Sequence, residues 1–125
     1  AAWLPSVCPS VGPPDPWDPG WSLRAMACYD AWLFGRVPTL KGPPLDPCSR
    51  WAFTLRAYNG GEGWLLRERR SAAASGANPN DWRAIEPFRV RARWAHNENT
   101  DYPRRILLRL EPAYRAAGWP GDVPC

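Results

Sequence analysis

Residues 46–61, DPCSRWAFTLRAYNGG, contain a complete predicted helix with a signal at each end. Asp46 followed by Pro47 is a helix-start pattern, because the carboxylate accepts from free backbone N–H groups and proline fits the first turn. Apolar and aromatic residues then recur at helical spacing, which predicts a helix to Tyr58. They are Trp51, Ala52, Leu55 and Tyr58. The run Asn59-Gly60-Gly61 is a typical helix stop.

The same criteria predict helices on both sides of this one. Ser22 is the expected N-cap of a helix over 22–35 whose inward face includes Leu23, Met26 and Leu33. A third helix is expected over 63–75, ending at Gly76. Asn80 or Asp81 is the expected N-cap of a short helical segment that is broken by Pro87. The remaining segments predict a helical stretch over 88–96 and a last helix opened by the polar residues 97–101, with Pro103 in its first turn, which ends at Gly118.

No β-branched alternation of any length occurs, so the sequence predicts an all-α, single-domain chain. Residues 1–20 form a Pro-rich lead-in, and residues 21–125 form the helical domain. We place four tryptophans in the core by default: Trp32, Trp51, Trp82 and Trp94.

The composition of the 125 residues excludes several classes of protein. Sixteen Pro and ten Gly interrupt the chain too often for a coiled coil, and no run approaches the ~20 apolar residues of a membrane span. The first twenty residues lack a signal-peptide pattern, so we expect an exported form to be mature or trimmed. The net charge is +4, but the arginines are spaced singly along predicted helices, which makes nucleic-acid binding an unfavoured interpretation.

The four cysteines predict two disulfides and an oxidising compartment. Cys8, Cys28, Cys48 and Cys125 are too far apart in sequence for a zinc knuckle, and His96, which we interpret as a helix-end residue, is the only histidine. The alternative is four buried thiols. Of three possible connectivities we favour Cys28–Cys48 and Cys8–Cys125. We expect no metal and no cofactor.

Two segments carry the functional information: LRAYNGGEGW at 55–64 and ENTDYPRRIL at 98–107. Each taken alone is explained as well by helix-end chemistry as by a site. Together and in this order they resemble the soluble lytic transglycosylases and goose-type lysozyme-like domains that cleave peptidoglycan, most closely the phage and prophage versions. The upstream DPGWSLRAMACYDAWLFGRV is also similar, so the resemblance covers about residues 18–119.

The resemblance implies a lysozyme-like fold and a sugar-binding groove lined by Tyr58, Asn59, Gly60 and Gly61 from the first segment and by Glu98 and Tyr102 from the second. Aromatic faces pack against sugar rings, amides bond to hydroxyl and N-acetyl groups, and glycines allow close approach to the backbone. Glu98 has a simpler explanation too, as a helix cap or a partner of Arg104 or Arg105.

The family's essential glutamate, in an E-S-x-(F/W)-x-P type segment, has no match in this chain, and neither does the Gly-Leu-Met-Gln type segment that follows it. Three explanations stay open: a fragment, a deletion that keeps binding or a structural role, or a relocated acid. Glu62 is our candidate for the last, because the family motif has an apolar residue there; the alternative is a solvated loop glutamate. Glu68 is expected to stay ionised within its arginine run.

The expected function is therefore cleavage of the bond between N-acetylmuramic acid and N-acetylglucosamine by acid catalysis from one glutamate, assisted by the sugar's own groups. The alternative is a non-catalytic cell-wall-binding or virion-structural relative. The expected partners are peptidoglycan strands, with a missing N-terminal segment or a virion component as further possibilities. The expected location is outside the cytosol: periplasmic, secreted or virion-associated.

Overall fold

The computed structural model describes residues 4–121 and 124–125, and over these residues the chain is helical with no strand, as predicted. The chain divides into two compact units, residues 1–36 and 37–125. The domain boundary expected at residue 20 stays a prediction. None of the helices in the described part of the chain is long and apolar enough to cross a membrane.

The first unit consists of α1 (Leu4–Val7), the short 3-10 helix η1 (Pro9–Val11) and the long helix α2 (Pro19–Arg36). Its core is a small apolar cluster of buried side chains contributed by all three elements: Leu4, Cys8, Val11, Trp21 and Ala25. Helix α2 starts earlier than expected. The carboxylate of Asp18, not Ser22, accepts the backbone N–H groups of Gly20 and Trp21 at 3.2 and 3.1 Å. Leu33 is buried, whereas Leu23 and Met26 are exposed.

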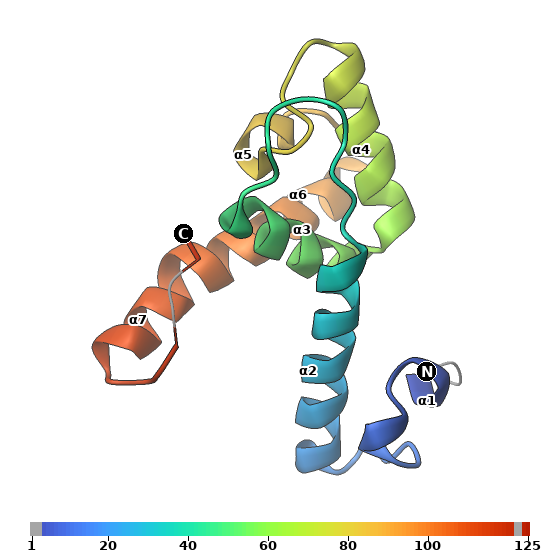
Figure 1. Cartoon of the computed structure of the whole chain (residues 1–125), viewed down its shortest axis with the longest axis vertical. Coiled ribbons are helices and arrows are strands. Elements are labelled where there is room, and N and C mark those ends of the chain that lie inside the picture. Colours follow the sequence, from blue (N-terminus) through green and yellow to red (C-terminus); the bar gives the residue numbers. More distant parts are fainter. Residues whose placement is uncertain (1–3, 122–123) are drawn as a thin grey trace. The chain divides into compact units, whose positions relative to one another are not determined.

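The second unit is built around α3 (Pro47–Gly60), which packs against α6 (Arg93–Arg104), α4 (Glu62–Ala74) and α5 (Trp82–Ile85). Figure 1 shows α6 continuing through the π-helical η2 (Arg105–Leu110) into α7 (Glu111–Ala116) as one rod. Asp46 caps α3 as predicted, since its Oδ1 accepts from Ser49 N at 2.8 Å. Asp81 caps α5 in the same way. Gly76, at φ 84°, follows the end of α4.

The predicted fourth and fifth helices were placed wrongly. Residues Phe88–Ala92 are not helical, and the polar residues 97–101 lie inside α6 instead of opening a helix. The buried side chains of Asn99 and Thr100 show why, because contacts with the rest of the unit override the local preference of polar residues for a loop. Pro103 also lies inside α6, and the helix continues through the wider turns of η2.

Both disulfides form, but the predicted pairing was wrong. The bonds are Cys8–Cys28 and Cys48–Cys125. Cys8 follows α1 and packs with α2 in the first unit's core, which brings it beside Cys28. Cys48 lies in the first turn of α3, and the chain after α7 returns to it. Two disulfides are typical of a protein that folds outside the cytosol.

Candidate functional site

The first half of the site is the C-terminal end of α3. The helix stops because Gly61 has φ 94°, a conformation that favours glycine, while its N–H still bonds to Ala57 O at 2.8 Å. This stop leaves Tyr58 and Asn59 partly exposed at the helix end. Glu62 follows at once as the first residue of α4 and is half-buried.

The second half of the site is the middle of α6. The ring of Tyr102 stacks on that of Tyr58, with centroids 6.4 Å apart and planes inclined by 11°. One turn earlier, the buried Asn99 donates from Nδ2 to Asn59 Oδ1 at 3.1 Å and to the Arg56 carbonyl at 2.8 Å. The two segments that the sequence singled out therefore meet in space.

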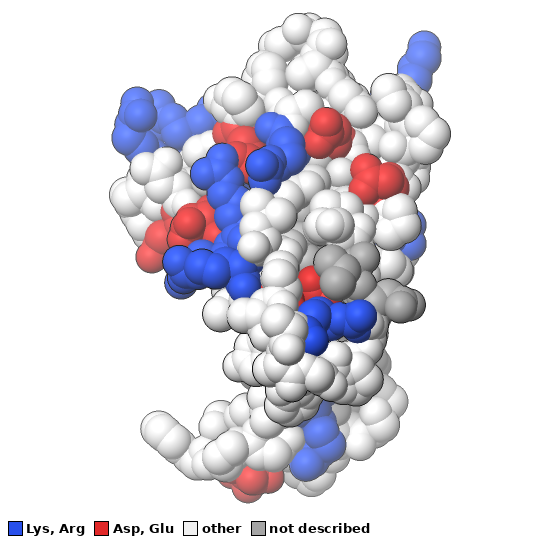
Figure 2. Space-filling model, turned by 90° about the vertical axis from the view of Figure 1, so that its left-hand side faces the viewer, with Lys and Arg blue, Asp and Glu red and all other residues white. Residues whose placement is uncertain are grey.

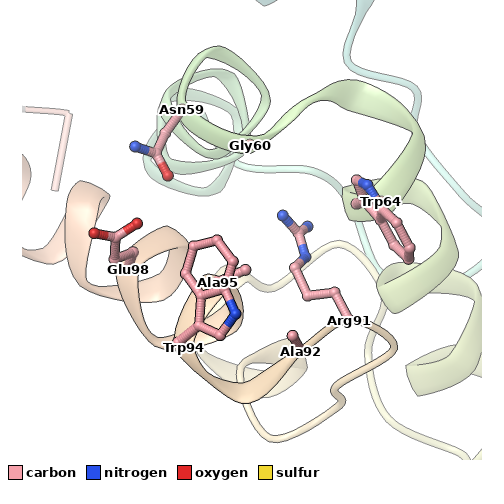
Figure 3. A pocket seen from close by; sticks show the side chains of 8 residues that line it. All are labelled: Asn59, Gly60, Trp64, Arg91, Ala92, Trp94, Ala95 and Glu98. Carbon is pink, nitrogen blue, oxygen red and sulfur yellow. The ribbon is translucent and has the colours of Figure 1, made fainter.

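A pocket of about 490 Å³ opens between these two segments. Figure 3 shows its lining, which is Asn59 and Gly60 from α3, Trp64 from α4, and Arg91, Ala92, Trp94, Ala95 and Glu98 from α6 and the residues before it. Three of the residues expected at the groove line this pocket: Asn59, Gly60 and Glu98. Tyr58, Gly61, Glu62 and Tyr102 are not among the lining residues, although all belong to the same two segments.

The sequence analysis placed Trp94 in the core, and that prediction was wrong. Its side chain is 71% exposed and borders the pocket, and Trp64 across from it is 43% exposed. Large exposed aromatic side chains beside a concave site are typical of carbohydrate-binding surfaces, because each ring offers a flat apolar face.

Beneath the pocket lies a buried cluster of charged residues that the sequence did not reveal. Glu68 is fully buried and pairs with Arg56, which is equally buried, and with Arg91 Nε at 2.8 Å. Burial lowers the pKa of Arg56, and the neighbouring Glu68 carboxylate opposes that change. Arg56 also donates from Nε to Asn99 Oδ1 at 2.8 Å, so the cluster is joined to the Asn59–Asn99 bond.

His96 completes this cluster from inside α6, so its interpretation as a helix-end residue was wrong. Its Nε2 lies 2.7 Å from the carbonyl oxygen of Glu86, an atom that only accepts, so Nε2 carries a proton and donates it. Its Nδ1 lies 3.3 Å from Glu68 Oε1. Among the described residues, no group of three or more His, Cys, Asp or Glu side chains is arranged to hold a metal ion.

Charged side chains of both signs share the surface around these elements. On the face shown in Figure 2, basic and acidic side chains lie close together and uncharged surface separates the groups. One exposed ion pair of the second unit joins Arg105 Nε to Asp101 Oδ2 at 2.8 Å. Exposed pairs of this kind contribute little to stability.

The sequence of this chain is similar to that of a known lytic transglycosylase. The chain is 32% identical over 111 residues to the membrane-bound lytic murein transglycosylase F of Thiobacillus denitrificans, a match that covers 74% of this chain. The chain spans only about a quarter of that relative, 23% of its length. No family model matches the sequence, and no solved structure matches it. Over most of its length, the chain is thus a distant relative of a lytic transglycosylase.

Proposed function

We propose that this chain is a lytic-transglycosylase-like domain that binds and cleaves the glycan strand of bacterial peptidoglycan, at the bond between N-acetylmuramic acid and N-acetylglucosamine. The observation that carries the proposal is the stacking of Tyr58 on Tyr102 beside the Asn59–Asn99 hydrogen bond. It joins the two sequence segments that resemble the transglycosylases, and the similarity to transglycosylase F supports it.

In this proposal each residue has a role that its chemistry allows. Asn59 uses its side-chain NH₂ group, which is not engaged in the bond to Asn99, to donate to a sugar carbonyl or hydroxyl oxygen. Tyr58 and Tyr102 form an aromatic wall for a sugar ring. Gly61 leaves the backbone open at the helix end, Gly60 lines the pocket, and Glu98 accepts from sugar hydroxyl groups at the pocket edge.

Cleavage needs an acid that protonates the glycosidic oxygen. We assign this role to Glu62, which directly follows the AYNGG helix end at the start of α4. The two disulfides support a location outside the cytosol, and we propose a periplasmic, secreted or virion-associated protein of phage or prophage type.

The test is the release of soluble fragments from purified sacculi, identified by mass spectrometry. We expect release by the wild-type chain, a loss of at least ~100-fold in Glu62→Gln, and unchanged release in Asp15→Asn, an exposed carboxylate of the first unit. Glu98→Gln separates the two carboxylates, since we expect it to weaken binding more than turnover. Full release by Glu62→Gln contradicts the assignment of the acid, and an inactive wild-type chain contradicts cleavage.

A further inference from the structure

A second pocket of the second unit, of about 510 Å³, lies between the end of α5 and α6, and the proposed function does not use it. We call it the α5–α6 pocket. We propose that it binds a polymer of polyol units joined by phosphodiester groups, such as a glycerol phosphate polymer. Its lining is almost entirely polar, and the polar lining residues are Arg83, Glu86, His96, Asn97, Thr100 and Arg104.

The spacing along α6 separates this pocket from the one beside Asn59. Asn97, Thr100 and Arg104 follow one another at three and four positions, so they share one face of the helix. Glu98, which borders the first pocket, lies about 100° around the helix from Asn97 and about 160° from Thr100. The two pockets share no lining residue. The inference is therefore independent of the proposed function.

The cationic groups of the α5–α6 pocket are accessible to a ligand. Arg83 is exposed, its Cζ lies over the Trp82 ring at 5.0 Å from the centroid, and no carboxylate in the described part of the chain pairs with it. The side chain of Arg104 is 50% exposed. It donates from Nε and Nη2 to the Glu86 carboxylate, which leaves Nη1 for a ligand.

The charges of the lining favour an anion. Two arginines, Arg83 and Arg104, border the pocket with the single carboxylate of Glu86. Arg104 and Glu86 compensate each other, so the charge of Arg83 is in excess. A guanidinium presents parallel N–H groups that match the two oxygens of a phosphate or carboxylate group. A phosphodiester carries one negative charge, which equals the excess on the protein.

The uncharged part of the lining suits hydroxyl groups. The exposed side-chain amide of Asn97 can both donate and accept. Thr100 Oγ1 donates to the carbonyl oxygen of Asn97 at 3.2 Å, and its lone pairs can accept from a ligand hydroxyl. Pro87 is the one lining residue without a polar side chain. A polyol carrier fits such a surface better than an acyl chain does.

The same lining does not favour nucleic acid, the other abundant phosphodiester polymer. Binding of single strands depends on exposed aromatic rings on which bases stack. The ring nearest to this pocket, Trp82 beneath Arg83, is only 4% exposed, and the pocket has no aromatic lining residue. The combination of a cation with hydroxyl-binding groups and no stacking surface therefore points to a polyol phosphate.

Calorimetry with the full chain tests the chemistry of the ligand. The probes are glycerophosphoglycerol, a linear glycerol phosphate polymer, neutral diglycerol and sodium acetate. We expect both phosphodiesters to bind at least about tenfold more tightly than diglycerol and acetate, with an affinity that falls as salt is added. Equal affinity for acetate would reveal an adventitious ion only, and equal affinity for diglycerol would show that the charge has no role. Either result overturns the inference.

Two substitutions should change the affinity for the polymer in opposite directions. Arg83→Gln removes the excess charge, and we expect binding to weaken about fivefold. Glu86→Gln removes the carboxylate and releases Arg104, so binding should become tighter. Arg70→Gln, at an exposed arginine of α4 outside the pocket, is the control for net charge. Equal losses in Arg83→Gln and Arg70→Gln would overturn the site.

Two further assays identify the source of the phosphodiester and separate this inference from the proposed function. Sedimentation with phosphatidylglycerol vesicles offers the same group on a membrane, and binding to vesicles without binding to the polymer overturns the inference in favour of a lipid headgroup. On sacculi free of phosphate polymers, Arg83→Gln should release fragments at the wild-type rate. A failure of polymer binding leaves that release unaffected, and an inactive wild-type chain leaves the polymer measurements unaffected.

Discussion

Asn99 donates a hydrogen bond to Asn59 across 40 positions of sequence, and the same side chain accepts one from the buried Arg56. The first bond orients a residue of the pocket, and the second belongs to the buried charged cluster. One amide therefore connects the surface that would meet a ligand with the charges underneath it.

Replacing Asn99 by alanine should lower the stability of the chain and remove the hydrogen bond that orients Asn59 at the pocket. The change leaves the Arg56 Nε and its carbonyl oxygen buried without partners, which costs about 2–3 kcal/mol of unfolding free energy. Urea denaturation measures this value. Asn97→Ala, on the exposed side of the same helix, is the control and should stay within about 0.5 kcal/mol of wild type. Equal effects of the two substitutions would show that the Asn99 contacts contribute nothing.

Two glycines near the site should respond to alanine in opposite directions. At Gly60 the new Cβ meets Arg91 Nη1 and Asn99 Nδ2, each at 2.5 Å, and we expect a loss of about 1–3 kcal/mol. At Gly63, inside α4, nothing lies within 4 Å, so alanine should stabilise the helix by up to about 1 kcal/mol. Thermal unfolding of both variants checks the sign, and a stable Gly60→Ala would mean that Arg91 moves aside freely.

The start and end of α3, the end of α4 and the start of α5 were predictable because their causes are local. Asp46 and Asp81 cap the helices that follow them, and Gly61 and Gly76 have the positive φ that their glycine identity suggests. The meeting of Tyr58 with Tyr102 followed from the resemblance of two segments and not from any spacing between them.

The buried charges were not predictable because a charge run gives no sign of which member faces inward. In the run 67–70 Glu68 and Arg69 are buried while Arg67 and Arg70 are exposed. Arg69 donates to the carbonyl oxygens of Pro38 and Pro79, partners that only the tertiary fold provides. Tertiary contacts, which the local sequence does not show, also decide that polar residues of α6 are buried and that Trp94 is exposed.

Glu68→Gln should destabilise the chain more than any single change at the pocket surface. It leaves Arg56 and Arg91 buried without a countercharge, and breaking a buried pair in this way typically costs about 3–5 kcal/mol. The exposed Glu98→Gln should cost less than about 0.5 kcal/mol. Chemical denaturation compares the two variants, and similar midpoints would contradict the pairing.

The raised pKa of Asp30, a residue of α2, should make the stability of the protein depend on pH. Burial raises the pKa of Asp30 from 3.8 to about 6. Because the folded state then holds the proton more tightly than the unfolded chain, stability falls as pH rises from about 4 to about 6 and stays reduced above that. The effect is on the order of 1 kcal/mol, since the side chain is only half-buried.

Asp30→Asn should remove this pH dependence and raise the stability at pH 7. Melting temperatures at pH 4.5 and pH 7 measure the change, with Asp15→Asn as the control for loss of an exposed negative charge. An unchanged difference between the two pH values in Asp30→Asn would assign the dependence to another group.

The pairing of the cysteines decides what a single cut would do to this molecule. Cys8–Cys28 closes a ring within residues 1–36, and Cys48–Cys125 closes another within residues 37–125. Neither ring encloses the peptide bond between Arg36 and Val37, so one proteolytic event there yields two separate polypeptides even without a reducing agent. Had the bonds been Cys28–Cys48 and Cys8–Cys125, the nicked protein would have remained one covalent molecule.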